Sequence, residues 1–153
     1  MDEEIRQRRG KGQEIILMKS EQTLIVIKPD GIRRRLIGKI ISRFEDKGFE
    51  VKDLRFFIFS PKKADEFYSV HKEKPFFEEL VSFISSAPVV ACVLEGDNAI
   101  NTVRQMTGAT KSFEAAAGTI RGDYGLGVTE NVIHASDSAE SFIKESGVIF
   151  NHT

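Results

Sequence analysis

Polar and charged side chains that could perform chemistry gather in three short segments, and the most informative is NVIHASDS at residues 131–138. His134 ends a short apolar run there and is followed by small polar residues. A neutral imidazole in a cleft acts as a nucleophile or a base. Glu145 follows about two turns along the next expected helix, where its carboxylate would orient the ring. A satisfied core histidine is the alternative, although the small polar neighbours favour a cleft.

The second segment is KPDG at residues 28–31, directly after a short apolar run. A lysine at the end of a buried strand has its charge held near the sheet edge, which suits a phosphate group. An ordinary turn that ends a strand explains the same four residues equally well.

The third segment runs from Arg104 through Thr110 to GTIRGD at residues 118–123. Two arginines and a threonine in one loop suit a di- or triphosphate, because guanidinium groups match phosphate oxygens. A structural salt bridge between Arg121 and a carboxylate such as Asp123 is the alternative. The glycines fit neither the P-loop nor the dinucleotide-binding spacing. Any nucleotide must therefore be held by side chains.

The elements that position these segments follow from apolar periodicity and turn residues in the first half of the chain. A β-branched apolar run predicts a central strand at residues 23–27. Helical spacing from residue 37, with Gly48 as the C-cap, predicts a helix, and alternation predicts a strand at residues 49–60. Ser60 and Pro61 start a helix that runs through Tyr68, and Pro75 starts another.

In the second half, a third buried strand is expected at residues 88–94, then a helix that ends near Gly108. A loop of more than twenty residues follows, with one helical patch at residues 113–116. A fourth strand is expected at residues 132–134, then a helix capped by Ser136 and Asp137 to about Ser146, and a strand-like segment at residues 147–150. This order contains the split β-α-β pattern of a ferredoxin-like α+β sandwich, with helices packed on a four-stranded antiparallel sheet.

Length and composition set the limits on class. The 153 residues, 41% hydrophobic and 29% charged, fit one domain at residues 21–153 after a charged arm at residues 1–20. A net charge of −1 argues against a protein built mainly to bind nucleic acid. Cys92 is the only cysteine, which excludes an intrachain disulfide, and it is expected to be buried and inert. The apolar stretches are too short to span a membrane and no signal peptide is evident, so a cytoplasmic location is expected.

Taken together, the segments resemble the nucleoside diphosphate kinase family over residues 21–150. Those that carry the resemblance are KPDG at 28–31, RFEDKG at 43–48, KPFF at 74–77, PVV at 88–90, EG at 95–96, GTIRGD at 118–123 and NVIHASDS at 131–138. The last of these is the family's signature around its phosphorylated histidine.

The resemblance implies γ-phosphate exchange between nucleoside triphosphates and diphosphates by a ping-pong route, with His134 as nucleophile and Glu145 as its orienting partner. It implies magnesium bridging the nucleotide phosphates, with no direct protein ligand and with Asp137 near it through water. It further implies homo-oligomers, with the hexamer as the expected form. The remaining implied roles are a phosphate clamp of Lys28, Arg104, Thr110 and Arg121, an aromatic neighbour Tyr68, a ribose contact Asn131, a base slot of Phe76, Leu80 and Val128, and support of Glu145 by Ser136.

Several positions depart from the family pattern. Arg35 stands where the family usually has glycine, so the turn there is expected to differ. Lys111 and Ser112 replace Asn-Pro, and Ala117 replaces a proline, in a loop that packs subunits together in the family. The departures therefore bear on assembly more than on chemistry.

Two other classes of function remain open at this point. A non-catalytic oligomeric binder of nucleotide or nucleic acid would use the basic N-terminal arm and the arginines at 33–35. A regulatory small-ligand domain would share the topology but leaves the His134 segment unexplained. The presence of His134 together with Glu145 favours the enzyme.

Overall fold

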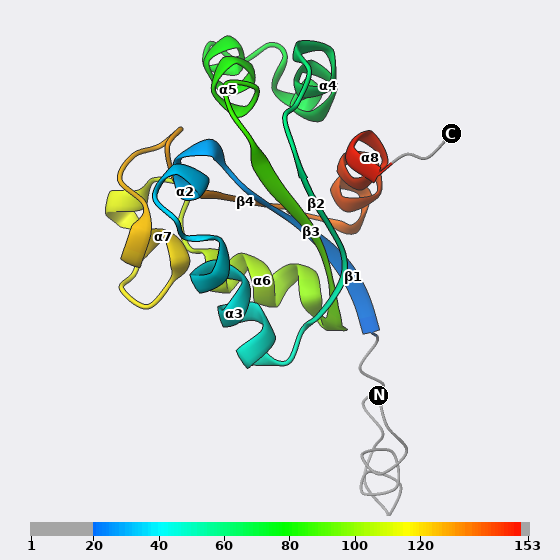
Figure 1. Cartoon of the computed structure of the whole chain (residues 1–153), viewed down its shortest axis with the longest axis vertical. Helices are drawn as coiled ribbons and strands as arrows, with labels where there is room; N and C mark the ends of the chain where they lie inside the picture. Colours follow the sequence, from blue (N-terminus) through cyan, green and yellow to red (C-terminus); the bar gives the residue numbers. More distant parts are fainter. Residues whose placement is uncertain (1–19, 151–153) are drawn as a thin grey trace, which may run out of the picture.

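Four strands form one antiparallel sheet in the order β2-β3-β1-β4 in the computed structural model, which describes residues 20–150 (Figure 1). The central strand β1 pairs with β3 on one side and with β4 on the other. Its last five residues are all buried, which explains the continuous apolar run. The strands are β1 (Ser20–Ile27), β2 (Glu50–Phe57), β3 (Val89–Asp97) and β4 (Ile133–Ala135). The predicted ferredoxin-like architecture is confirmed.

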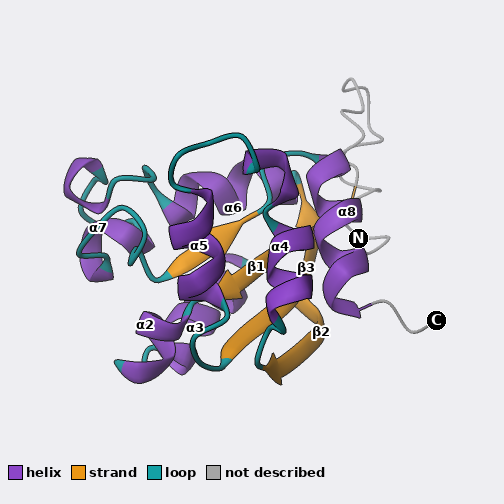
Figure 2. Ribbon diagram, turned by 90° about the horizontal axis from the view of Figure 1, so that it is seen from above, coloured by secondary structure: helices purple, strands orange, loops and turns teal. Residues whose placement is uncertain are grey.

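Helices cover both faces of this sheet (Figures 1 and 2). On one face, α3 (Ile37–Lys47) and α6 (Ala99–Thr107) pack against alternate β1 side chains, including Ile25 and Ile27. On the other, α4 (Pro61–Phe67), α5 (Phe77–Ile84) and α8 (Ala139–Phe150) pack against the intervening residues, including Leu24 and Val26. Successive side chains of β1 point to opposite faces of the sheet and thus contribute to two hydrophobic cores.

Local signals fix several element ends as predicted. Ser60 caps α4 by accepting a hydrogen bond from the Lys63 N–H at 3.1 Å, and Pro61 is the first helical residue. Gly48 ends α3 with a φ of 107°, which glycine adopts without strain. Cys92 is buried in β3, and burial raises the pKa of its thiol to about 12, as expected of an inert cysteine.

Two short helices were not expected from the sequence. The KPDG segment is the start of a single-turn helix, α2 (Pro29–Arg33), with Pro29 at its first position. The long loop contains α7 (Ile120–Tyr124) in addition to a 3-10 turn, η2 (Ser112–Glu114), near the predicted patch. Both helices are shorter than two turns, so periodicity could not reveal them.

Three helix boundaries were predicted wrongly. Pro75 does not open α5, because residues 75 and 76 lie in a turn that follows η1 (Ser69–His71), and the helix begins at Phe77. Ser138, rather than Ser136 and Asp137, caps α8 by accepting the Ser141 N–H at 3.0 Å. Residues 147–150 are helical rather than strand-like, because α8 continues and packs its apolar side chains on the second core.

No helix within residues 20–150 is long and apolar enough to cross a membrane. The predicted charged arm lies almost wholly outside the described residues, so the boundary at residue 20 stays a prediction.

Candidate active site

His134 lies in β4 directly opposite Val26 of β1, on the face of the sheet covered by α4 and α8. Its Nε2 atom is 2.8 Å from Oε1 of Glu145 in α8. The Ser136 hydroxyl donates to the same carboxylate oxygen at 2.7 Å. A carboxylate at Nε2 favours the tautomer that carries its proton there, which leaves the Nδ1 lone pair free. The arrangement is that of an oriented nucleophile or base.

Two aromatic rings enclose the imidazole. The Phe67 ring centroid lies 4.9 Å from that of His134, at 65° between planes, and the Tyr68 centroid lies 6.2 Å away, at 87°. Burial, followed by the nearby Glu145 carboxylate, raises the pKa of Tyr68, so its phenol is neutral. The sequence did not single out Phe67, because it reads as one more apolar residue of a helix.

Lys28 is buried at the end of β1, with 5% of its surface exposed. Its Nζ donates to Asn131 Oδ1 at 2.8 Å and to the Thr129 carbonyl at 3.3 Å. Burial first, and then the charge of Arg121, lower the pKa of Lys28 to about 7, although Asp30 opposes this. Both hydrogen-bond acceptors are uncharged, so neither of them neutralises the protonated form of Lys28.

Arg121 is buried at the start of α7 and has no carboxylate among its hydrogen-bond partners. Its guanidinium donates to the Ile133 carbonyl at 2.6 Å and the Gly108 carbonyl at 3.1 Å, while its buried Nε has no partner. Asp123 instead pairs with Arg43 at 2.6 Å, so the alternative of an Arg121–Asp123 salt bridge is wrong. Burial and the nearby Arg104 lower the pKa of Arg121 to about 10.

The loop that carries Arg121 is shaped by glycines. A Cβ at Gly122 would lie 1.9 Å from the Ala116 carbonyl oxygen, so only glycine permits this close approach. Thr119 caps α7 by accepting the Gly122 N–H at 3.0 Å. The GTIRGD segment therefore fixes the position from which Arg121 projects.

Arg104 and Thr110 stand at the exposed side of the same region. Arg104 donates to the carbonyl of Ala135, the residue after His134, at 3.1 Å. The Thr110 carbonyl accepts from Asn131 Nδ2 at 2.8 Å, which ties the long loop to the Lys28 contact. Lys28, Arg104 and Arg121 form a cationic cluster of the kind that binds a chain of phosphates.

The predicted base-slot residues lie at the surface. Phe76 and Val128 are 43% and 47% exposed, and Leu80 is half-buried. The His71 ring is 5.8 Å from Phe76 and 6.3 Å from Tyr68, so it links the slot to the His134 enclosure. No role was predicted for His71, because the charged residues that follow it indicate an exposed segment.

Within residues 20–150 no cluster of three or more His, Cys, Asp or Glu side chains could hold a metal ion. Asp137 is exposed beside His134, and a hydrogen bond from Ser141, at 2.6 Å, is the main cause that lowers the pKa of its carboxyl. Magnesium is commonly held by one or two carboxylates, water and substrate phosphates. One ionised carboxylate next to this cationic cluster fits an ion of that kind.

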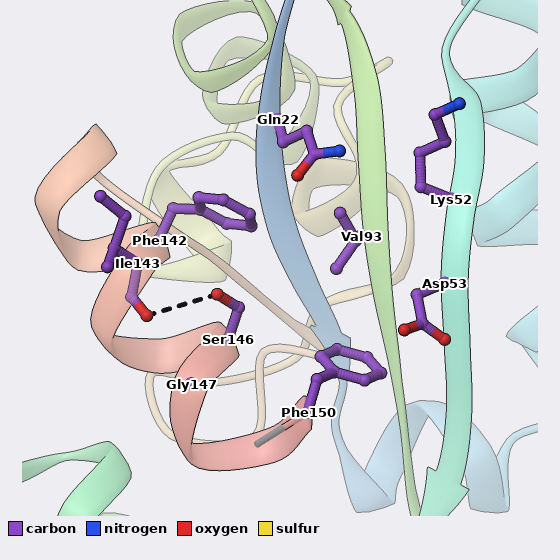
Figure 3. Close-up of a pocket in the computed structure, with 9 residues that line it drawn as sticks. All are labelled: Gln22, Lys52, Asp53, Val93, Phe142, Ile143, Ser146, Gly147 and Phe150. Carbon is purple, nitrogen blue, oxygen red and sulfur yellow. Dashed lines mark hydrogen bonds between the residues drawn. The ribbon is translucent and has the colours of Figure 1, made fainter. Parts of the chain in front are cut away.

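A shallow cavity of about 450 Å³ opens elsewhere, between α8 and the strands β1, β2 and β3 (Figure 3). Apolar side chains of α8 form one wall, and Lys52 and Asp53 of β2 stand opposite. None of the site residues described above lines it. Its lining residues are Gln22, Lys52, Asp53, Val93, Phe142, Ile143, Ser146, Gly147 and Phe150.

Comparison with known proteins places this geometry in context. The family model for nucleoside diphosphate kinase matches residues 21–153. The nucleoside diphosphate kinase of Staphylothermus marinus is 56% identical over 133 residues, covering 87% of this chain and 94% of that protein. That of Thermoplasma acidophilum is 50% identical, covering 88% and 90%.

Solved structures similar to this chain are also nucleoside diphosphate kinases. The Aquifex aeolicus nucleoside diphosphate kinase superimposes with a TM-score of 0.85 at 51% identity, covering 86% of this chain and 96% of that one. A halophilic nucleoside diphosphate kinase from Halobacterium salinarum, solved in complex with CDP, gives 0.84 at 44% identity, covering 87% and 89%.

Proposed function

The chain belongs to the nucleoside diphosphate kinase family and transfers the γ-phosphate of a nucleoside triphosphate to a nucleoside diphosphate; we propose that His134 carries the phosphate between the two. One observation carries the proposal. Glu145 accepts from His134 Nε2 while Ser136 supports the same carboxylate oxygen, so Nδ1 is the free nucleophilic atom. Each nucleotide would then react in turn with one pocket, in a ping-pong route.

In the first half-reaction the Nδ1 lone pair attacks the γ-phosphorus. The bond from that phosphorus to the bridging oxygen breaks, and the nucleoside diphosphate leaves with the electron pair. Glu145 stabilises the positive charge that develops on the imidazole. In the second half-reaction a terminal oxygen of another nucleoside diphosphate attacks the phosphorus, and the phosphorus–nitrogen bond breaks to regenerate neutral His134.

The cationic cluster of Lys28, Arg104 and Arg121 is proposed to hold the phosphates, together with Thr110. Phosphoryl transfer depends mainly on positioning and on stabilising the charge of the transferred group. Lys28 and Arg121 are buried and have no carboxylate hydrogen-bond partner, which suits this task because desolvation strengthens their attraction for an anion. The neutral Tyr68 phenol would stand beside the transferred group.

The rest of the nucleotide is assigned to neighbouring side chains. Asn131 would contact the ribose, Phe76 and Val128 would sandwich the base, and Leu80 would line the slot. Magnesium, bound to the phosphates and reached by Asp137 through water, would neutralise charge on the transferred group. The CDP bound to the Halobacterium salinarum relative supports a nucleotide as the ligand of this fold.

We infer a homo-oligomer, a hexamer of stacked dimers, that acts in the cytoplasm without nucleic acid or membrane. The edge strand β2 exposes Phe56, and the long loop exposes Phe113 and Leu126. Exposed apolar side chains at two separate places support two kinds of subunit contact. The rival proposal of a non-catalytic nucleotide binder does not explain why His134 is paired with Glu145.

The experiment is incubation with ATP alone, followed by mass measurement of the intact protein. One phosphate per chain is expected, labile in acid, stable in alkali and discharged by any nucleoside diphosphate. His134→Ala should abolish labelling. His134→Asn should abolish it too, because an amide is a much weaker nucleophile than an imidazole. A folded His134→Ala variant that still transfers phosphate would refute the mechanism.

A further inference from the structure

Val132, two residues before His134, has an unusual backbone conformation. Its φ is 63°, and it is one of three non-glycine residues with positive φ in residues 20–150, with Arg35 and Asn98. Only Val132 among them is β-branched, and it is fully buried. A β-branched residue in the left-handed region is strained, and such strain persists only where the surrounding structure enforces it.

Hydrogen bonds on both sides of Val132 enforce this conformation. The Ile133 N–H donates to the Asn131 carbonyl at 2.8 Å, which closes a three-residue turn around Val132. The Val132 carbonyl accepts from the Lys28 N–H at 2.8 Å. The Val132 N–H donates to Asp30 Oδ2 at 3.1 Å, and this is the only one of the three bonds made by a side chain.

Asp30 is held against this turn by the local shape of α2. A Cβ at Gly31 would lie 2.8 Å from Ile27 Cγ2 and 3.1 Å from the Val132 carbonyl oxygen, so glycine lets α2 approach the turn. Asp30 is 4% exposed, and its other oxygen, Oδ1, is buried without a partner. Burying a carboxylate with half of its acceptors unused is unfavourable, which points to a role beyond stability.

The turn at Val132 connects groups assigned to the nucleotide site. Asn131 accepts from Lys28 Nζ at 2.8 Å on one side of it. On the other side, Ile133 accepts from Arg121 at 2.6 Å and precedes His134. We propose that Asp30 is a positioning residue that, by holding the Val132 N–H, fixes the spacing between the phosphate-binding cations and the histidine nucleophile.

The test compares Asp30→Ala with Asp30→Asn. Alanine removes the acceptor, and we expect kcat to fall about tenfold or more, because small displacements of reacting groups are costly in rate. Asparagine keeps an oxygen acceptor for the Val132 N–H and should restore most of kcat. The Val132 amide should be protected from hydrogen exchange in the wild type and the asparagine variant, and unprotected in the alanine variant.

A glycine at position 132 provides an independent check, because glycine adopts positive φ without strain. Asp30→Ala should lower kcat less in the Val132→Gly background than in the wild type. The fold-reduction should be smaller by about threefold or more. The assays are run well below the unfolding temperature of every variant, so that a loss of stability does not lower the measured kcat.

The proposal is overturned if Asp30→Ala keeps kcat within about twofold, if asparagine is as damaging as alanine, or if glycine brings no relief. It rests on the proposed role of His134. The two fail separately, since His134→Ala tests the nucleophile and exchange of the Val132 amide reports the turn whichever residue carries the phosphate.

Discussion

At the scale of single residues, the site is defined by cations buried before any ligand arrives. The pKa values of Lys28 and Arg121 are both lowered, chiefly by burial and then by a neighbouring cation. Removing such charges from water is unfavourable, and an anionic ligand offsets the penalty. Nucleotide binding should therefore stabilise the folded chain as well as position the phosphates.

Arg121→Ala should lower kcat/KM by an amount equivalent to about 1–3 kcal/mol of transition-state stabilisation, since a charged donor to the transferred group is lost. Steady-state kinetics with ATP and a nucleoside diphosphate measures it. Arg33→Ala is the matched control, because Arg33 is exposed and its ion pair with Glu130 is solvated. Wild-type kcat/KM in the Arg121 variant would assign that residue a purely structural role.

The lowered pKa of Lys28 predicts a pH dependence of stability without nucleotide. Between its folded pKa of about 7 and its ordinary value of 10.5, the unfolded chain retains a proton that the folded chain has released. The Lys28 contribution to the free energy of unfolding therefore rises with pH across this window, by up to about 1.4 kcal/mol per pH unit. The free-energy cost of burying the charged Lys28 side chain is fully present below its folded pKa of about 7.

Lys28→Met removes the buried ammonium, so its gain in stability over the wild type should be largest below about pH 7 and shrink towards about pH 10. Urea unfolding of both proteins across that range measures the difference. A gain that stays constant with pH would show that Lys28 remains protonated in the folded chain.

At the scale of elements, the ends of most helices and strands follow from capping and turn residues, and the turn at Arg35 does not. Arg35 occupies the position where the family resemblance expects glycine, and its φ is 62°. The turn after α2 thus adopts a glycine-like conformation despite the substitution, with the Arg35 N–H donating to the Ile32 carbonyl at 3.0 Å. A positive φ is strained for a residue that carries a Cβ, so this turn stores strain.

Arg35→Gly should raise the free energy of unfolding by roughly 0.5–1 kcal/mol, because relief of left-handed strain exceeds the added freedom of the unfolded chain. Thermal unfolding measures the change. Arg35→Ala removes the same side chain but keeps the Cβ, and should give no such gain. A glycine variant less stable than the alanine variant would contradict the argument.

At the scale of the whole molecule, two groups of exposed apolar side chains lie outside the set of residues assigned to the proposed nucleotide site. Leu54, Phe56 and Ile58 alternate along and just beyond the edge strand β2, at 49%, 59% and 61% exposure. Phe113 and Leu126 are 75% and 78% exposed in the loop region that includes η2. An uncovered edge strand with apolar side chains is a ready site for pairing with a second copy.

Sedimentation equilibrium should give a hexamer for the wild type. Phe113→Asp should leave dimers, since it places a charge in the proposed loop contact while sparing the strand edge. Ile143→Asp is the control, because Ile143 is similarly exposed, at 70%, but lies on α8. A wild-type monomer at micromolar concentration would overturn the assembly proposal.

Features that depend on near neighbours along the chain could be predicted from the residues alone. The apolar run of β1, the cap at Ser60 and the left-handed Gly48 all follow from local hydrogen bonding and side-chain periodicity. The motif around His134 was sufficient to indicate the family. Domain limits, the assembly and the roles of the site residues stay predictions.

Contacts between residues far apart in the chain became known from the folded structure. Ser136 lies on Glu145 rather than capping α8, Phe67 packs on His134, and Asp123 pairs with Arg43 instead of Arg121. The Lys28–Asn131 bond joins residues 103 positions apart. Such contacts are set by packing of the sheet and its helices, and the same packing removes water and shifts the pKa values, so no local pattern encodes them.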